Sequence, residues 1–201
     1  MKKILLLFVV LLLLAGCGGT AGQEPAKTAS VEPTQTPTVA PTPEPTPEPT
    51  PDLGSKENPM PIGETFLGTY TDGSEGNQYV IGISLQETIR GDEALDVILD
   101  TYSLNPKPDE GKEYLIARFQ VGYISDITED NPPLYLNKFN FVFASSEGDF
   151  EYLPTVIMPE PAFDITLNEY DVSDGWLVFS VDVEDKSPKA VFANSLWFNL
   201  S

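Results

Sequence analysis

The chain has 201 residues, with 11 Lys and Arg against 31 Asp and Glu, a formal net charge of −20 at pH 7. A field of that sign repels nucleic acid, and no basic stripe follows phosphates, so we expect no nucleic-acid partner. Histidine is absent and Cys17 is the only cysteine. Ser-His-Asp and Cys-His catalysis need an imidazole, and the usual zinc sites need His or several Cys. We therefore expect neither an enzyme of these types nor a cofactor.

Residues 1–16 predict a signal peptide. Lys2 and Lys3 precede eleven apolar residues, Ile4 to Leu14, which are too few for a bilayer span of about 20 residues. Leu14-Ala15-Gly16-Cys17 resembles the lipobox of bacterial lipoproteins. The resemblance implies cleavage between Gly16 and Cys17 and a diacylglycerol on Cys17. The chain would then be lipid-anchored on the extracytoplasmic face of the cell membrane, in a Gram-positive bacterium.

The chemistry of Cys17 favours that interpretation. A lone exported thiol has no cysteine to pair with in this chain. Two acyl chains give stable membrane binding, whereas one chain gives only marginal binding. The alternative is an ordinary secretory signal in which Cys17 has no special role.

Residues 17–54 predict a disordered linker rich in Pro, Thr and Glu. Proline stands at every second position from Pro41 to Pro51, which forbids a helix and favours polyproline II. At about 3.1 Å per residue, such a segment reaches on the order of 90 Å. We expect it to act as a spacer between the membrane and the folded domain.

Residues 55–201 predict one folded domain. It holds all eight Tyr, both Trp and ten of the eleven Phe, which is enough to bury a substantial core. Apolar residues alternate with polar ones in several runs, and turns rich in Gly, Pro, Asn and Asp separate them, which is typical of short strands. About seven strands favour an all-β, immunoglobulin-like β-sandwich. The clearest runs are 79–85, 113–125, 139–143, 177–183 and 191–200.

One short helix interrupts the strands. Asp92 is a candidate N-cap, and Asn105-Pro106 ends the segment. Because the helix is inserted between two strands, we expect it to cover one end or edge of the sandwich. Its apolar residues share one face: Ala94, Leu95, Ile98, Leu99 and Tyr102.

Three motifs resemble a large group of Gram-positive lipoprotein domains. They are Asn58-Pro59-Met60-Pro61-Ile62-Gly63-Glu64, Gly111-Lys112-Glu113-Tyr114-Leu115 and Gly175-Trp176-Leu177-Val178-Phe179, the last followed by Ala190-Val191-Phe192. On these motifs the domain is similar to the telokin-like, immunoglobulin-like class named domain of unknown function 4352. The resemblance implies a sandwich fold and carries no catalytic residue.

Two kinds of ligand motif are present. Arg90-Gly91-Asp92 spells an adhesion tripeptide, but it joins a strand to a helix and short motifs often match by chance. Two acidic groups are weak calcium candidates, because calcium needs six to eight oxygen ligands. One is Asp126, Glu129 and Asp130, and the other is Asp182, Glu184 and Asp185. Solvated turn acids explain both groups as well, and we expect no metal.

The sequence favours a binding or interaction module at the cell envelope, with a protein or a cell-wall polymer as partner. The first alternative is a hydrolase of envelope polysaccharide that uses two carboxylates, with Trp176 and Trp197 stacking on the sugar. The other is a purely structural accessory of a membrane complex. With 26 acids in 55–201, some pair at the required separation is almost inevitable, so such a pair is no evidence for an enzyme. We do not expect an enzyme.

Overall fold

The computed structural model describes residues 52–73, 75–126 and 132–201. The predicted signal peptide, Cys17 and the linker up to Pro51 lie outside the described residues, as do Glu129 and Asp130. Gly54, which the sequence assigns to the linker, is buried, and its carbonyl accepts a hydrogen bond from the Trp197 amide at 2.9 Å. The folded domain therefore includes Gly54.

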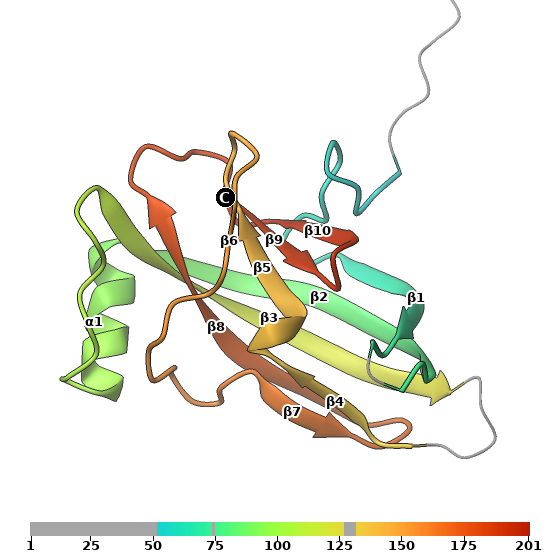
Figure 1. Ribbon diagram of the computed structural model, residues 1–201. Coiled ribbons are helices and arrows are strands. Elements are labelled where there is room, and N and C mark those ends of the chain that lie inside the picture. Colours follow the sequence, from blue (N-terminus) through green and yellow to red (C-terminus); the bar gives the residue numbers. More distant parts are fainter. Residues whose placement is uncertain (1–51, 74, 127–131) are drawn as a thin grey trace, which may run out of the picture. The chain divides into compact units, whose positions relative to one another are not determined.

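Two four-stranded antiparallel sheets form the domain, in the orders β1-β2-β3-β8 and β10-β9-β5-β6, and a two-stranded pair, β4-β7, lies beside them (Figure 1). The prediction of an all-β sandwich with one short helix is confirmed. The strands are β1 (Thr65–Thr71), β2 (Gln78–Arg90), β3 (Lys112–Asp126), β4 (Leu134–Asn137), β5 (Phe141–Ala144), β6 (Phe150–Glu151), β7 (Asp164–Leu167), β8 (Val172–Asp182), β9 (Lys189–Phe192) and β10 (Leu196–Asn199). The helices are α1 (Asp92–Thr101) and the 3-10 helix η1 (Lys138–Asn140).

The core fills the space between the two large sheets. Alternate residues of β3 point inward and are fully buried, as the period-two pattern predicts: Leu115, Ala117, Phe119, Val121 and Tyr123. The Phe119 ring stands at the centre, with ring centroids 4.7 Å from Phe141 and 5.2 Å from Phe198 on the opposite sheet. Aromatic contacts of this kind join the two sheets without a disulfide.

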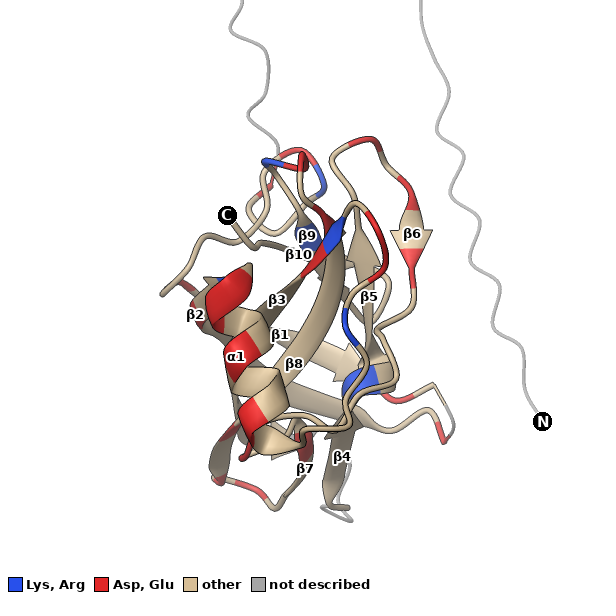
Figure 2. Ribbon diagram, turned by 90° about the vertical axis from the view of Figure 1, so that its left-hand side faces the viewer, with Lys and Arg blue, Asp and Glu red and all other residues tan. Residues whose placement is uncertain are grey.

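The helix α1 covers the outer face of the first sheet. Ala94 and Ile98 pack on Tyr114, Ile116 and Val178, so both faces of the start of β3 are buried. Figure 2 shows α1 alongside this sheet, with its acidic residues on the solvent side. Among the described residues, no helix is long and apolar enough to cross a membrane.

The predicted N-cap of this helix is wrong. Gly91 is the N-cap residue and Asp92 is the first residue of the helix, with no side-chain cap hydrogen bond. Gly91 has φ 73° and ψ −138°, a conformation that is essentially restricted to glycine. The sharp turn from β2 into α1 therefore depends on Gly91, and Asp92 contributes only its charge near the helix N-terminus.

Two sequence runs differ from the strands they predict. Phe139 does not continue the alternation of Phe141 and Phe143: it lies in η1 and is 82% exposed, because Asn137 caps that turn by accepting from its amide. The run 191–200 is two strands, since Ala193 and Asn194 take positive φ values of 48° and 58° and reverse the chain.

A close backbone approach closes the edge at β8. The Trp176 amide donates to the Pro161 carbonyl at 2.8 Å, and the Phe163 amide donates to the Trp176 carbonyl at 3.0 Å. A Cβ on Gly175 would stand 2.6 Å from the Cα of Phe163. Only glycine allows this segment to lie against β8.

Candidate functional site

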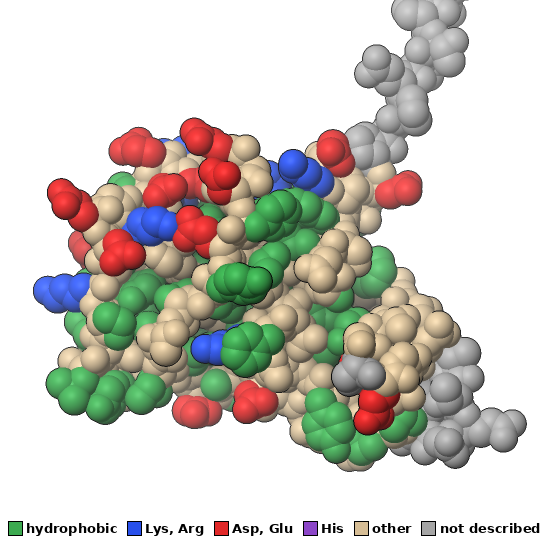
Figure 3. Space-filling view, in the orientation of Figure 1, with side chains coloured by type: hydrophobic (Ala, Val, Ile, Leu, Met, Phe, Trp, Pro, Cys, Tyr) green, Lys and Arg blue, Asp and Glu red, His purple; other side chains and the backbone are tan. Residues whose placement is uncertain are grey.

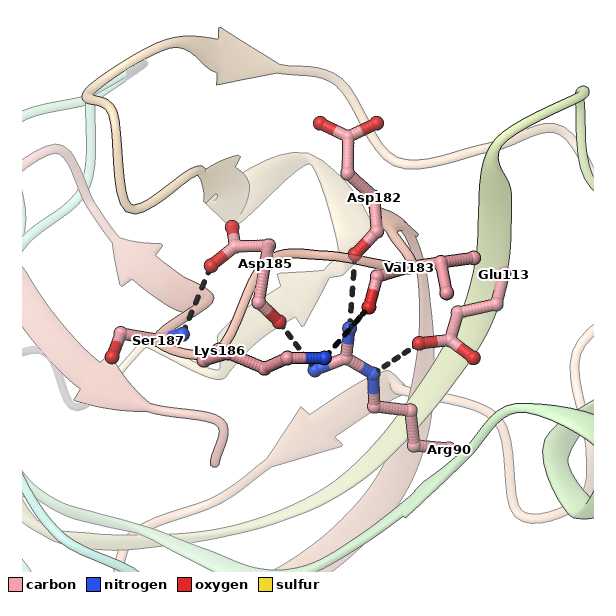
Figure 4. Close-up of polar contacts among 7 residues, drawn as sticks. All are labelled: Arg90, Glu113, Asp182, Val183, Asp185, Lys186 and Ser187. Carbon is pink, nitrogen blue, oxygen red and sulfur yellow. Dashed lines mark hydrogen bonds and ion pairs between the residues drawn. The ribbon is translucent and has the colours of Figure 1, made fainter.

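Arg90, the last residue of β2, binds the start of β3 and the end of β8 with its following turn (Figure 4). Its Nε donates to the Glu113 carboxylate at 2.5 Å. Its Nη1 donates to the Asp185 carbonyl at 2.7 Å, and its Nη2 donates to the Asp182 carbonyl at 2.9 Å. The planar guanidinium can reach all three groups at once, which a lysine ammonium cannot do.

The adhesion tripeptide is therefore used inside the domain. The Arg90 guanidinium donates hydrogen bonds to the turn between β8 and β9. Gly91 is the N-cap of α1, and Asp92 is the first residue of that helix. An integrin-type contact needs a protruding loop that offers both charges freely. Here the Arg90 charge is bound within the domain and Asp92 lies in a helix, so the three residues do not form such a loop.

Asp185 is the buried carboxylate of the same turn. Its Oδ1 accepts from the Ser187 amide at 2.9 Å, and its Oδ2 accepts from the Ser146 amide at 3.0 Å. Burial alone raises the pKa of Asp185, but the hydrogen bonds from Ser187 and Ser146 and the charge of Arg90 outweigh it and bring the pKa below its usual value. Asp185 thus joins the β8–β9 turn to the turn between β5 and β6.

An acidic hollow of about 400 Å³ opens beside Asp185. It is lined by Gly111, Ser145, Ser146, Glu147, Asp149, Glu151, Asp182, Glu184 and Asp185. Lys112 binds both oxygens of Glu151, at 2.7 and 2.6 Å, and this hydrogen bonding raises the pKa of Lys112. On one side of the hollow, the Lys112 ammonium thus neutralises the charge of Glu151.

One of the two predicted calcium groups lies at this hollow, whereas the other is described only at Asp126. Asp182, Glu184 and Asp185 all line the hollow, but Asp185 is held by two amides. In the described ranges, no three His, Cys, Asp or Glu side chains are grouped so that they could hold a metal ion. In the first group, Asp126 ends β3, while Glu129 and Asp130 are not among the described residues.

A second feature is an exposed aromatic surface on the other sheet. We define the aromatic face as Phe139, Phe150, Tyr152 and Trp197. Tyr152 is 89% exposed, Phe139 82% and Phe150 58%, whereas Trp197 is half-buried. Figure 3 shows hydrophobic side chains grouped down the middle of this side of the molecule, with acidic side chains gathered above them. Large apolar side chains exposed together are typical of an interaction site.

Strand pairing places Phe150 and Trp197 on the outside of the sheet β10-β9-β5-β6. Phe150 is the cross-strand partner of Ala144, and Trp197 is the partner of Val191. The Phe150 and Trp197 rings meet edge to face with centroids 5.8 Å apart, and Ala144 and Val191 beneath them are buried. The Lys56 ammonium lies 5.8 Å from the Trp197 ring. These contacts hold one half of the aromatic face in place.

A smaller hollow, which we call the ring hollow, lies between two of these aromatic residues. It has a volume of about 210 Å³ and is lined by Val142, Phe150, Glu151, Tyr152 and Asn194. Val142 lies on the outer side of β5, and Asn194 belongs to the β9–β10 turn. The positive φ of Asn194 therefore serves this site, since it sets where the turn runs beside the sheet.

The two tryptophans have different surroundings. Trp176 is half-buried beside the cluster under α1, and the Arg118 guanidinium lies 5.8 Å from its ring. Arg118 also donates to Asp174 at 2.6 Å. Trp176 therefore covers the first sheet, whereas Trp197 belongs to the aromatic face.

Sequence reasoning missed the aromatic face. It placed Phe139 in a strand, and it did not single out Phe150 or Tyr152. A signal was present, because Phe150-Glu151-Tyr152 sets two large rings directly after the polar turn Glu147-Gly148-Asp149. Large rings so close to a hydrophilic turn have little core within reach.

Comparison with known proteins gives a distant structural likeness and no family. No protein-family model matches the chain, and no curated protein matches it. Among solved structures, it is similar to the secreted protein MPT63 of Mycobacterium tuberculosis, with 14% identity and a TM-score of 0.45. The match covers 70% of this chain and 97% of that one. The class that the fold and the exposed face define is an all-β sandwich domain with one helix on its outer side.

Proposed function

We propose that this protein is an extracytoplasmic lipoprotein whose β-sandwich binds a partner at the cell envelope through the aromatic face. The exposure of Phe139 on η1, of Phe150 on β6 and of Tyr152 directly after β6 carries the proposal. Aromatic rings dominate binding energy at interfaces, since each offers a large contact area at a small entropic cost. Leaving such rings in water is explained if a partner covers them.

The anchoring half of the proposal depends on the leader. The charged start, the short apolar run and Leu14-Ala15-Gly16-Cys17 together favour lipidation of Cys17 and attachment to the membrane through diacylglycerol. A domain held at the membrane in this way meets partners of the envelope, whether proteins or wall polymers.

Kinship with the lipoprotein domains of unknown function 4352 belongs to the same proposal. The resembling motifs occupy structural positions that suit it. Met60 is buried and bonds to β10 through the Trp197 carbonyl at 2.8 Å and the Asn199 amide at 2.9 Å. Gly111 precedes β3, and Gly175 allows the close approach at β8. All three motifs are thus explained by the fold and none by a reaction.

The acidic hollow is the observation that favours the hydrolase alternative, because several carboxylates line it. A glycoside hydrolase of the two-carboxylate kind needs a general acid that keeps its proton near neutral pH. Asp185, the buried carboxylate of the hollow, has a lowered pKa and binds two amides, which suits a structural task. This contrast supports a binding module over an enzyme.

Retention of a partner from envelope extract tests the proposal. The full chain, purified in detergent, is compared with the variant Phe139→Ser/Tyr152→Ser and with the matched control Leu104→Ser/Tyr170→Ser. The control removes a leucine 75% exposed and a tyrosine 76% exposed elsewhere on the surface.

We expect the wild type and the control to retain one component in stoichiometric amounts, and the face variant to retain at least tenfold less. The loss reflects two rings worth roughly 1–2 kcal/mol each at an interface. Equal retention by the face variant would show that the aromatic face is not the binding site.

A further inference from the structure

We propose that the partner of the aromatic face is an uncharged glycan strand, with one sugar ring seated in the ring hollow. The inference rests on the proposed function and specifies its ligand. It draws on three observations: the composition of the hollow, the spacing of the exposed rings, and the charge of the domain.

The ring hollow has the chemistry that a sugar ring requires. A pyranose has apolar C–H faces and a rim of hydroxyl groups, so it needs flat apolar walls and polar groups at the edge. Phe150 and Tyr152 supply rings, Val142 supplies an apolar floor, and Asn194 supplies an amide. Small-molecule sites combine mostly apolar walls with a few placed polar groups in the same way.

Glu151 separates the ring hollow from the acidic hollow. It is the cross-strand partner of Phe143, whose side chain points into the core, and its carboxylate binds Lys112 of β3 at 2.6 and 2.7 Å. Its side chain therefore points to the opposite face of β6 from Phe150. The negative charge of Glu151 still lies next to the ring hollow and disfavours an acidic group there.

The exposed rings are spaced rather than fused into one apolar patch. Phe150 and Trp197 form a ring pair, whereas Tyr152 and Phe139 make no ring contact with another aromatic residue within 52–73, 75–126 and 132–201. A protein interface of standard size has a contiguous, desolvated centre. A polymer of similar rings meets separate aromatic platforms one unit at a time, which fits the observed arrangement.

The charge of the domain selects among polymers. Residues 55–201 carry eight Lys and Arg against 26 Asp and Glu, a net charge of −18. The acidic hollow also shares Glu151 with the ring hollow. Phosphate-rich or carboxylate-rich wall polymers are repelled by this field, whereas an uncharged glycan is not.

Titration with defined oligosaccharides tests the inference. The full chain in detergent is titrated by calorimetry with β-1,4-linked hexamers of N-acetylglucosamine and of glucose, and with polygalacturonate as the anionic comparator. The variant Tyr152→Ser removes one wall of the ring hollow. Tyr170→Ser is the control, since Tyr170 is 76% exposed in the β7–β8 turn.

We expect saturable binding of at least one uncharged hexamer, weakened tenfold or more by Tyr152→Ser and unchanged by Tyr170→Ser, with no binding of polygalacturonate. Failure of both hexamers to bind, or equal binding by Tyr152→Ser, overturns the glycan assignment. If the envelope experiment still retains a protein that depends on Phe139 and Tyr152, the proposed function stands and only the ligand class is wrong.

Discussion

At the scale of single residues, Gly175 shows how one missing side chain permits a contact between segments. The backbone at Ala162 and Phe163 lies so close that a Cβ at Gly175 would stand 2.6 Å from the Phe163 Cα and 2.7 Å from the Ala162 carbonyl oxygen. Because these are backbone atoms, no side-chain rotation relieves the clash. The segment must move or the strand must bend.

We therefore expect Gly175→Ala to lower the free energy of unfolding by about 1–3 kcal/mol, the usual cost of overpacking a filled site. Gly122→Ala is the control, since its Cβ would meet Val172 at an ordinary 3.4 Å. Urea denaturation followed by tryptophan fluorescence measures both. A Gly175→Ala protein as stable as the Gly122→Ala protein contradicts the argument.

Asp185 gives the domain a stability that depends on pH. Because its folded pKa lies below the unfolded value, the ionised group stabilises the fold above the unfolded pKa. That contribution is lost as pH falls through the folded pKa, so the affected window lies below about pH 4.

Asp185→Asn should remove this part of the pH dependence. The amide can accept only one of the two N–H groups of Ser146 and Ser187, so we expect a loss of about 1–3 kcal/mol at pH 7 and a shallower fall in stability on acidification. Asp182→Asn is the control, because only the carbonyl of Asp182 is used by Arg90. Melting temperatures between pH 2.5 and 7 decide the question; parallel curves for Asp185→Asn and wild type argue against the assignment.

At the scale of elements, Asn105 fixes the end of α1 to a distant segment. Its Nδ2 donates to the Ile98 carbonyl at 3.0 Å and to the Ile157 carbonyl at 2.9 Å, and its Oδ1 accepts from the Ile157 amide at 2.8 Å. One buried side chain thus adds a second hydrogen bond to the Ile98 carbonyl, which already accepts from the Tyr102 amide, and joins the helix to the chain that leads toward β7.

Asn105→Ala removes the partner of the Ile157 amide and carbonyl and one of the two bonds to the Ile98 carbonyl, and we expect a loss of about 1–3 kcal/mol in the free energy of unfolding. Amide exchange should rise in α1 and around Ile157 together, since both lose the same contact. Ser103→Ala, in the same loop and exposed, is the control. Faster exchange in the helix without a change at Ile157 would show that Asn105 acts only as a local cap.

The sequence predicted the long elements well and the short ones poorly. The alternation in β3 and the apolar face of α1 follow directly from packing on one or two sides, so period and burial agree. In β2, register shifts at Val80/Ile81 and Leu85/Glu87 break the alternation, which is why the predicted strand stopped at Leu85 although β2 runs to Arg90. At Phe139 and in the run 191–200, local turn geometry interrupted the alternation of apolar and polar residues.

The candidate site was predictable only in part. The acids of the β8–β9 turn were visible in the sequence, and the structure shows that Asp185 serves the fold there. The aromatic face depends on which side of β5 and β6 meets the core, and this is decided by pairing between segments that are far apart in the chain. The exposure of Phe139 depends on the cap from Asn137, which breaks the alternation.

At the scale of the whole domain, charge and aromatic surface are unevenly distributed. Carboxylates gather at the end where the β5–β6 and β8–β9 turns meet, and the exposed rings lie beside them on one sheet. The field of the acids falls off within about 8–10 Å at physiological salt, so it acts on a ligand mainly at the ring hollow. Discrimination against anionic ligands and stacking contacts thus operate at the same place.

The hydrogen bond between the Gly54 carbonyl and the Trp197 amide has a mechanical consequence. A pulling force applied to the chain at residue 52 passes into β10 through this bond and through the bonds that Met60 makes with Trp197 and Asn199. The same force also passes along the backbone into β1, which belongs to the other sheet. Traction on this end of the domain is therefore shared between the two large sheets.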